Sequence, residues 1–167
     1  MAATGNTLPG TGSNNAGIGA TAWVNPENVT ADDGTESTCT AGASSQYLVA
    51  SNFGFRIPEG SLILGVTVRI EARESSFGAE TINIRLQDDT GALTGTGKTQ
   101  SINGNVLTVY TLGSSSDLWG ATLTPAMVND ADFGVRFWYT TAHNMAVDHV
   151  TMAIEYRPPG LMLLGVV

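Results

Sequence analysis

The sequence contains a single lysine, Lys98, and only two histidines among its 167 residues. It has 15 acidic side chains against 7 basic ones, which gives a formal net charge of −8. A protein that binds a phosphate backbone needs a cluster of Lys or Arg to release condensed counterions, whereas the arginines here are scattered along the chain. We therefore expect no nucleic acid among its partners.

Cysteine and long apolar runs are equally scarce. Cys39 is the only cysteine, so an internal disulfide is excluded, and we expect Cys39 to lie in a strand as a small apolar residue. No window reaches the roughly 20 apolar residues of a membrane helix. Residues 1–6 lack the basic stretch and apolar core of a secretory signal. The sequence therefore predicts no membrane partner.

Charged residues make up only 13% of the chain, against 42% hydrophobic residues. A single domain of this size buries about 70% of its unfolded surface, so it needs neither a metal nor a disulfide to fold. Its polar surface must instead consist of Ser, Thr, Asn, Gln and Gly. Such a neutral, hydrogen-bonding surface is common in extracellular and viral β-proteins. We expect one domain and no cofactor.

Apolar and polar residues alternate along most of the chain, which is the period of a strand with one buried face. In the clearest stretch, residues 65–73, Val66, Val68 and Ile70 fall on one face and mostly charged residues on the other. Similar alternation occupies residues 81–87, 133–139 and 149–156, and weaker candidates are residues 21–24, 37–41, 46–55 and 106–112. These patterns predict an all-β fold, an antiparallel, jelly-roll-like β-sandwich of about eight strands.

One short helix is predicted at residues 124–130. Thr124 stands at an N-cap position and Pro125 at the first helical position, and both are typical of a helix start. The segment is long enough for a turn or two, so we expect it to cross between the two sheets.

The chain is predicted to divide into three parts. Residues 1–20 are rich in glycine and form an extended N-terminal arm, either disordered or ordered against a neighbouring subunit. Residues 21–157 form the β-sandwich domain. Residues 158–167 form an apolar C-terminal tail, because two prolines end the last strand. This tail either folds back over its own core or docks into a partner.

Two segments are similar to nucleotide- or calcium-binding motifs, but their residue spacing or their neighbouring elements do not match those motifs. Residues 92–99 resemble a phosphate-binding loop, but Ala92 stands where that motif needs glycine. They also lie between two β-stretches rather than before a helix. Two Asp-Asp pairs, at residues 32–33 and 88–89, lack the alternating ligands of a calcium loop and are expected to form turns.

The sequence also shows no set of residues arranged for catalysis. Asp148 and His149 are neighbours in a predicted strand, so their side chains are expected to point to opposite faces and not to contact each other. Asp148 would then form hydrogen bonds at a turn or strand start, and His149 would lie at the surface or at a subunit boundary. Four other carboxylates qualify by residue type alone, and nothing singles out a hydrolytic pair among them: Glu71, Glu74, Glu80 and Asp117. We predict no catalytic, cofactor-binding or metal site, and hence no enzyme.

The apolar tail and two tryptophans supply the candidate partner interface. Trp138 has the opposite parity to Phe137 and Tyr139, so its ring is predicted to lie on the outer face of its strand. An exposed indole there could stack on a sugar, anchor a protein interface or be covered by the N-terminal arm. The residues assigned to this interface are Leu161, Met162, Leu163, Leu164, Trp23 and Trp138.

Six segments form an ordered set of short motifs over residues 19–157. Among them are Asp132-Phe-Gly-Val135 and Val147-Asp-His-Val150. The whole set comprises residues 19–34, 47–60, 63–71, 115–125, 132–135 and 147–150. Together these segments resemble β-sandwich structural proteins of tailed bacteriophages, which include capsid decoration (cement) proteins and tail-associated modules.

The resemblance implies a structural virion protein, a capsid decoration (cement) protein that binds and stabilises capsomers of the major capsid protein. It implies a homo-oligomer, and we expect a trimer because closed symmetry of this kind is common in such proteins. The protein would occupy the capsid exterior of the virion, after residing in the host cytoplasm before assembly. The alternative is a carbohydrate- or receptor-binding β-sandwich module of a phage tail fibre or cell-surface protein. A small hydrolase ranks last.

Overall fold

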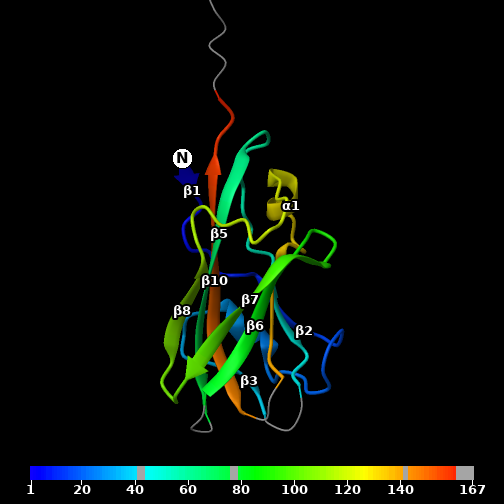
Figure 1. Cartoon of the computed structure of the whole chain (residues 1–167), viewed down its shortest axis with the longest axis vertical. Coiled ribbons are helices and arrows are strands. Elements are labelled where there is room, and N and C mark those ends of the chain that lie inside the picture. Colours follow the sequence, from blue (N-terminus) through cyan, green and yellow to red (C-terminus); the bar gives the residue numbers. More distant parts are fainter. Residues whose placement is uncertain (41–43, 76–78, 141–142, 161–167) are drawn as a thin grey trace, which may run out of the picture.

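The computed structural model of the chain describes residues 1–40, 44–75, 79–140 and 143–160. These residues form ten strands in two five-stranded antiparallel sheets that pack face to face (Figure 1). Sheet A consists of β1 (Ala2–Ala3), β3 (Ser37–Cys39), β5 (Leu62–Glu74), β8 (Thr108–Gly113) and β10 (Met145–Arg157). Sheet B consists of β2 (Thr11–Asn15), β4 (Tyr47–Ser51), β6 (Ala79–Gln87), β7 (Leu93–Asn103) and β9 (Gly134–Trp138). The predicted all-β sandwich is confirmed.

The strand order places the longest strands at the centre of sheet A. That sheet runs β1-β10-β5-β8, with β3 also paired to β10, and sheet B runs β2-β4-β9-β6-β7. Two short helices complete the described part of the chain, a 3-10 helix η1 (Pro26–Thr30) and an α-helix α1 (Pro125–Asn129). As predicted, the Thr124 hydroxyl accepts a hydrogen bond from the Met127 amide, 3.2 Å away.

The core lies between the two sheets and is built by the alternation seen in the sequence. Val66, Val68 and Ile70 are fully buried on the inner face of β5. The inner face of sheet B supplies Phe137 and Val135. The largest fully buried side chains of the core also include Trp119, Tyr139 and Phe133. The inner faces of both sheets therefore form one continuous apolar core.

Strand β7 is the main element that the periodicity did not reveal. It covers residues 93–103, which include most of the loop-like segment 92–99 that was expected to lie between two β-stretches. The strand pairs only with β6 and lies at the edge of sheet B. Ile102 is its only buried residue, so the sequence of β7 has no apolar face to alternate with a polar one. The expected strand at 21–24 is reduced to isolated bridges at Thr21 and Val24.

Residues 1–20, expected to form an extended arm, are extended and pair with the sandwich of their own chain. Strand β1 pairs with the end of β10, and β2 adds a strand to sheet B beside β4. Gly12 shows why glycine stands in this segment. A Cβ at that position would lie 2.2 Å from the Pro26 carbonyl oxygen. Here glycine allows a close approach to η1 rather than supplying flexibility.

Strand β1 and the last residues of β10 lie at the same end of the sandwich, because Ala2 is paired with Tyr156 (Figure 1). The interface candidates Leu161, Met162, Leu163 and Leu164 lie outside the described residues. Within the described ranges, no helix is long and apolar enough to span a membrane.

Gly113, at the end of β8, offers a test of the packing around Trp119. The Trp119 indole N–H donates a hydrogen bond of 2.9 Å to the Val66 carbonyl. A Cβ at Gly113 would lie 2.2 Å from that carbonyl oxygen and 2.6 Å from the indole nitrogen, and the backbone has φ +75°. We expect Gly113→Ala to lower the free energy of unfolding by at least about 3 kcal/mol, since a clash adds to backbone strain.

Gly104→Ala is the matched control for this substitution. Gly104 has φ +79°, and a Cβ at that position would meet no atom within 4 Å, so only the backbone strain applies. We expect a loss of about 1 kcal/mol for this variant. Urea denaturation followed by circular dichroism measures both values, and equal losses would contradict the packing described around Trp119.

Candidate functional site

The outer face of sheet B carries a row of side chains that crosses all five strands. The pairing registers align Asn15 with Tyr47, Asn83 with Trp138, and Thr99 with Asn83. The β4–β9 register, in which Leu48 faces Phe137, places Tyr47 beside Trp138. We call these five residues the aromatic row. It sets two aromatic rings at the centre and amide or hydroxyl groups on both sides.

The two rings of the aromatic row support each other. Their centroids are 5.2 Å apart and their planes are nearly perpendicular, at 85°. The Trp138 side chain is partly exposed, whereas Tyr47 is buried beneath its neighbours. The Asn83 side-chain amide donates a hydrogen bond of 3.4 Å to the Trp138 carbonyl. Tyr47 thus supports the Trp138 ring, Asn83 binds the Trp138 main chain, and the Trp138 side chain remains partly exposed.

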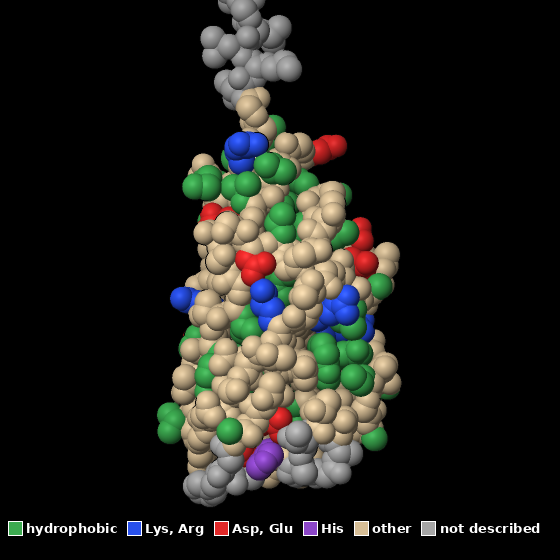
Figure 2. All heavy atoms as spheres, in the orientation of Figure 1, with side chains coloured by type: hydrophobic (Ala, Val, Ile, Leu, Met, Phe, Trp, Pro, Cys, Tyr) green, Lys and Arg blue, Asp and Glu red, His purple; other side chains and the backbone are tan. Residues whose placement is uncertain are grey.

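Arg136 lies two residues before Trp138 in β9, so its side chain is on the same outer face of sheet B and supports the aromatic row. Its guanidinium carbon lies 5.0 Å from the centre of the Tyr47 ring. Its Nε donates a hydrogen bond of 2.7 Å to Gln87 Oε1, and a second guanidinium nitrogen donates to the Gly91 carbonyl. Burial lowers the pKa of this guanidinium. In the view of Figure 2, Lys and Arg side chains gather at mid-height beside hydrophobic ones.

The three tryptophans have different surroundings. Trp138 lies on the outer face of its strand, as its parity predicted. Trp23 does not fit the predicted partner interface, because it is only 2% exposed. Its ring meets Tyr139 edge to face at 5.9 Å, and its indole N–H donates to the Gln46 carbonyl. Its place in the core leaves no ring face for a partner of the folded chain.

On the other side of the molecule, a β-bulge in β10 brings together two residues that were expected to point apart. Ala72 of β5 is paired with Val147, and Ile70 with Val150. Asp148 and His149 therefore both lie opposite the one intervening residue, Glu71. Asp148 Oδ2 and His149 Nδ1 are 3.1 Å apart. The prediction for this pair was wrong, because simple alternation does not hold across a bulge.

Glu71 and the loop after η1 complete a group that we call the carboxylate–imidazole cluster: Asp32, Glu71, Asp148 and His149. His149 Nδ1 lies 3.3 Å from Glu71 Oε2 and 3.6 Å from Asp32 Oδ1. One ligand-type atom from each of the four residues lies within 4.8 Å of all the others. His149 is 8% exposed and Asp148 only 1%, so both are buried, and a surface position for His149 is ruled out.

The cluster does not have the geometry of a glycoside hydrolase. Such an enzyme needs two carboxylates about 5–9 Å apart across a cleft, so that a sugar fits between them. Here the carboxylates converge on one imidazole, and no room is left between them. The other carboxylates considered from the sequence are held elsewhere. Glu74 and Glu80 are buried, and Asp117 forms an ion pair of 2.7 Å with Lys98.

The loop that carries Asp32 is fixed to sheet A by an ion pair. Arg73, on the same outer face of β5 as Glu71, binds both carboxylate oxygens of Glu36, with 2.7 Å between Nη2 and Oε2. This contact raises the pKa of Arg73. A two-point Arg–carboxylate contact restricts orientation as well as distance. Asp32 is therefore presented to the cluster by an anchored loop.

The pKa of Glu71 reflects this crowded setting. Burial raises the pKa of its carboxyl, and contact with Asp148 and the charge of Asp32 raise it further, while His149 lowers it. Asp148 and Asp32 disfavour ionisation of Glu71, because like charges repel at short range. The charged form of Glu71 is therefore costly in this setting.

Two other features considered from the sequence have structural roles. Cys39 is buried in β3, and its carbonyl accepts a hydrogen bond from the Tyr139 hydroxyl. Asp88 caps the turn before β7, where it accepts hydrogen bonds from the Thr90 and Ala92 amides. A hydrogen bond from the Thr90 hydroxyl, together with these two amide bonds, lowers the pKa of Asp88.

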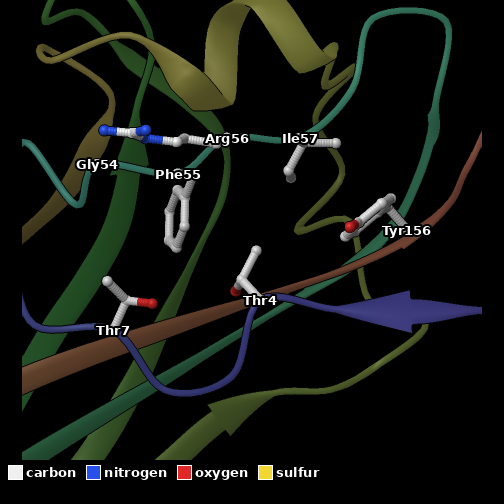
Figure 3. A pocket seen from close by; sticks show the side chains of 7 residues that line it. All are labelled: Thr4, Thr7, Gly54, Phe55, Arg56, Ile57 and Tyr156. Atoms are coloured by element: carbon white, nitrogen blue, oxygen red, sulfur yellow. The ribbon is translucent and has the colours of Figure 1, made fainter.

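A shallow hollow of about 290 Å³ lies at the end of the sandwich where β1 meets the end of β10 (Figure 3). Thr4 and Thr7 from the N-terminal segment and Tyr156 from β10 line one side. Phe55 and Ile57, from the segment between β4 and β5, line the other. Its polar lining comes from the two threonines, Arg56 and Tyr156.

Comparison with known proteins shows a shared fold. Neither a protein-family model nor a curated protein sequence matches the chain. The structure resembles the CBM22-1–GH10 modules of Clostridium thermocellum xylanase 10B in complex with xylohexaose, with TM-score 0.52 and 14% identity. That match covers 96% of this chain and 28% of the xylanase chain. The chain therefore spans less than a third of that protein.

Two further solved structures show a weaker likeness. The enzymatically active domain of bacteriophage CBA120 tailspike protein 4 has TM-score 0.49 and 15% identity, over 86% of this chain and 19% of that one. The family 11 carbohydrate-binding module of Clostridium thermocellum Lic26A-Cel5E has TM-score 0.37 and 14% identity, over 95% and 94%. At such identities a likeness concerns the fold and not the ligand.

Arg136→Lys tests whether the guanidinium braces the aromatic row. Lysine offers a point charge in place of a planar fork, so the bonds to Gln87 and Gly91 cannot both persist. We expect a loss of about 1–2 kcal/mol in unfolding free energy, measured by urea denaturation. Arg85→Lys is the control, since Arg85 makes a single bond of 3.3 Å to the Thr94 carbonyl. An equal effect of both substitutions would show that Arg136 has no special role.

Proposed function

We propose that the chain is a carbohydrate-binding β-sandwich module that holds an oligosaccharide against the outer face of sheet B. The observation that carries this proposal is the aromatic row, Asn15, Tyr47, Trp138, Asn83 and Thr99, which spans the sheet. Such a module binds its ligand without catalysing a reaction.

The chemistry of the row suits a sugar. A pyranose ring presents C–H groups on its faces and hydroxyl groups around its rim. The faces pack against an indole, and the hydroxyl groups exchange hydrogen bonds with amides and hydroxyls. Trp138 offers the ring, while Asn83 and Asn15 offer side-chain amides on either side. Because the row crosses five strands at about 4.8 Å spacing, it is long enough for several sugar units.

The side chains of the row are also held before any ligand arrives. The Trp138 ring contacts Tyr47 edge to face, and the Arg136 guanidinium lies 5.0 Å from the centre of the Tyr47 ring. A site whose rotamers are fixed in advance loses less conformational entropy on binding. Support also comes from the shared fold with modules whose structure contains xylohexaose, which makes xylo-oligosaccharides the first ligands to test.

The test begins with a glycan array probed with the purified chain, containing neutral and acidic oligosaccharides as well as xylohexaose. Titration follows any positive ligand by tryptophan fluorescence. Trp23 and Trp119 are buried, so a change in emission reports mainly on Trp138. Absence of binding to every glycan on the array would contradict the proposed function.

Trp138→Ala should weaken binding of a positive glycan by at least about tenfold, because one stacked ring contributes about 1–3 kcal/mol. Isothermal titration calorimetry measures the affinity, and circular dichroism shows that the fold is kept. Tyr156→Ala is the matched control, since Tyr156 is a partly buried aromatic residue of sheet A that packs beside the core. A loss of binding in the control, or none in Trp138→Ala, would place the ligand elsewhere.

A second candidate function is the capsid-cement role implied by the phage resemblance. What favours it is the meeting of β1 with the end of β10, beside the hollow lined by Phe55 and Tyr156, at one end of the sandwich. An apolar tail that leaves from this end could engage a neighbouring subunit or a capsomer. This role requires the major capsid protein as partner, a trimeric assembly and a place on the capsid exterior.

Co-sedimentation with purified phage capsids tests the cement role. If it holds, the full chain pellets with capsids and a variant lacking residues 158–167 stays in the supernatant, because the tail supplies the contact. Light scattering should then give the mass of a trimer. A monomer that stays in solution with capsids, with or without the tail, would contradict the cement role.

A further inference from the structure

We propose that the carboxylate–imidazole cluster on the outer face of sheet A binds one divalent transition-metal ion, of the Zn²⁺ or Mn²⁺ class, through Asp32, Glu71, Asp148 and His149. This site lies on a different sheet from the aromatic row and does not depend on the carbohydrate proposal.

The spacing of the four residues fits one ion. Zn²⁺ binds His nitrogen and carboxylate oxygen at about 2.0–2.2 Å, so the edges of its tetrahedron measure about 3.3–3.6 Å. His149 Nδ1 lies 3.1 Å from Asp148, 3.3 Å from Glu71 and 3.6 Å from Asp32. All the remaining separations are at most 4.8 Å. Small side-chain rotations are enough to close the set around a cation.

A separate observation points to a missing ligand. Asp148 is 1% exposed, and its Oδ1 has no hydrogen-bond partner within the described structure. A buried carboxylate oxygen without a partner is costly, and native proteins rarely leave one unsatisfied. The other oxygen of the same carboxylate already contacts His149. A metal ion in the cluster would satisfy the carboxylate that the fold has withdrawn from water.

The donor set indicates the class of metal. Three carboxylates carry more negative charge than one imidazole can balance, so the group calls for a divalent cation. Calcium and magnesium favour oxygen ligands alone, whereas imidazole suits zinc, iron, copper and nickel, and mixed sets of carboxylate and imidazole suit zinc and manganese. His149 therefore distinguishes this site from a calcium site. Asp32, whose side chain is 70% exposed, gives the ion a route from solvent.

The bound ion would join three segments that are distant in sequence. Asp32 comes from the loop after η1, Glu71 from β5, and Asp148 and His149 from the bulge of β10. The Arg73–Glu36 ion pair already holds that loop against β5. The ion would thus act as a clamp on the outer face of sheet A, and its binding should stabilise the folded chain.

The experiment uses the full chain, stripped with EDTA and dialysed. Calorimetric titrations with ZnCl₂, MnCl₂ and CaCl₂ are run separately, together with thermal unfolding in each metal. Co²⁺ serves as a spectroscopic probe, because tetrahedral coordination gives intense visible absorption. We expect one equivalent of Zn²⁺ or Mn²⁺ to bind more tightly than Ca²⁺ by at least about tenfold, and to raise the melting temperature.

Substitutions locate the ion. Glu71→Gln and His149→Gln should each weaken binding by at least about tenfold, since each removes one ligand. Asp148→Asn tests the buried carboxylate, and circular dichroism shows whether that variant folds; Glu71→Gln, at a half-buried position, decides the matter if it does not. Asp33→Asn and His143→Gln are controls of the same residue types outside the cluster, and neither should change the affinity.

Three results would overturn the proposal. The first is no binding of Zn²⁺ or Mn²⁺ to the folded chain. The second is equal affinity in the wild type, Glu71→Gln and His149→Gln, which would place the ion elsewhere. The third is Ca²⁺ binding as tight as Zn²⁺ and unchanged in His149→Gln, which would mean that the imidazole is not a ligand.

Discussion

The antiparallel pairing of β5 with β10 is the interaction on which the rest of the structure depends. Each strand has 13 residues, and both lie at the centre of sheet A. At about 3.3 Å per residue, such a strand runs nearly the whole length of the sandwich (Figure 1). Their inward side chains, among them Ile70 and Met152, are fully buried against sheet B. A change in their register would therefore expose one whole side of the core.

The bulge in β10 is compatible with the register of β5 and β10. It adds one residue to β10 opposite Glu71, and the apolar side chains on both sides of it still point into the core. A simple one-residue slip would turn Val150, Met152 and Ile154 to the outer face. By placing two residues opposite Glu71, the bulge restores the inward direction of Val150. The extra residue appears on the outer face, where Asp148 and His149 meet. The same irregularity thus preserves the core and creates the cluster.

Much of the fold could be predicted because the physical signal is local. Burial of one face imposes alternation on β5, β6, β9 and β10, and the parity of Trp138 follows from it. Strand β7 could not be found in this way, since an edge strand with Ile102 as its one buried residue needs no apolar face. The glycine-rich residues 1–20 were expected to form an extended arm, yet Gly12 serves a close contact with η1 that only the tertiary structure reveals.

The two candidate sites differ in the same way in how far the sequence could predict them. The aromatic row depends on which residues face each other across strands, so Trp138 was foreseeable and its alignment with Tyr47 and Asn83 was not. The cluster was missed for a stronger reason. The assumption that neighbours in a strand point apart excluded contact between Asp148 and His149, and no local signal in the sequence marks a bulge. Asp32 is recruited by a loop, and only Glu71 had a predictable orientation.

The convergence of charge in the cluster is unusual for this chain. Only 13% of its residues are charged, and solvated carboxylates on a surface repel one another and spread apart. Here three carboxylates meet beside one of the two histidines, and one of them is buried. Glu71 and Asp148 cannot move apart, because Val147 and Val150 on one strand and Ala72 and Ile70 on the other are fixed in the core on both sides of the bulge. The packing of the sandwich therefore holds the cluster in a shape that repulsion alone would open.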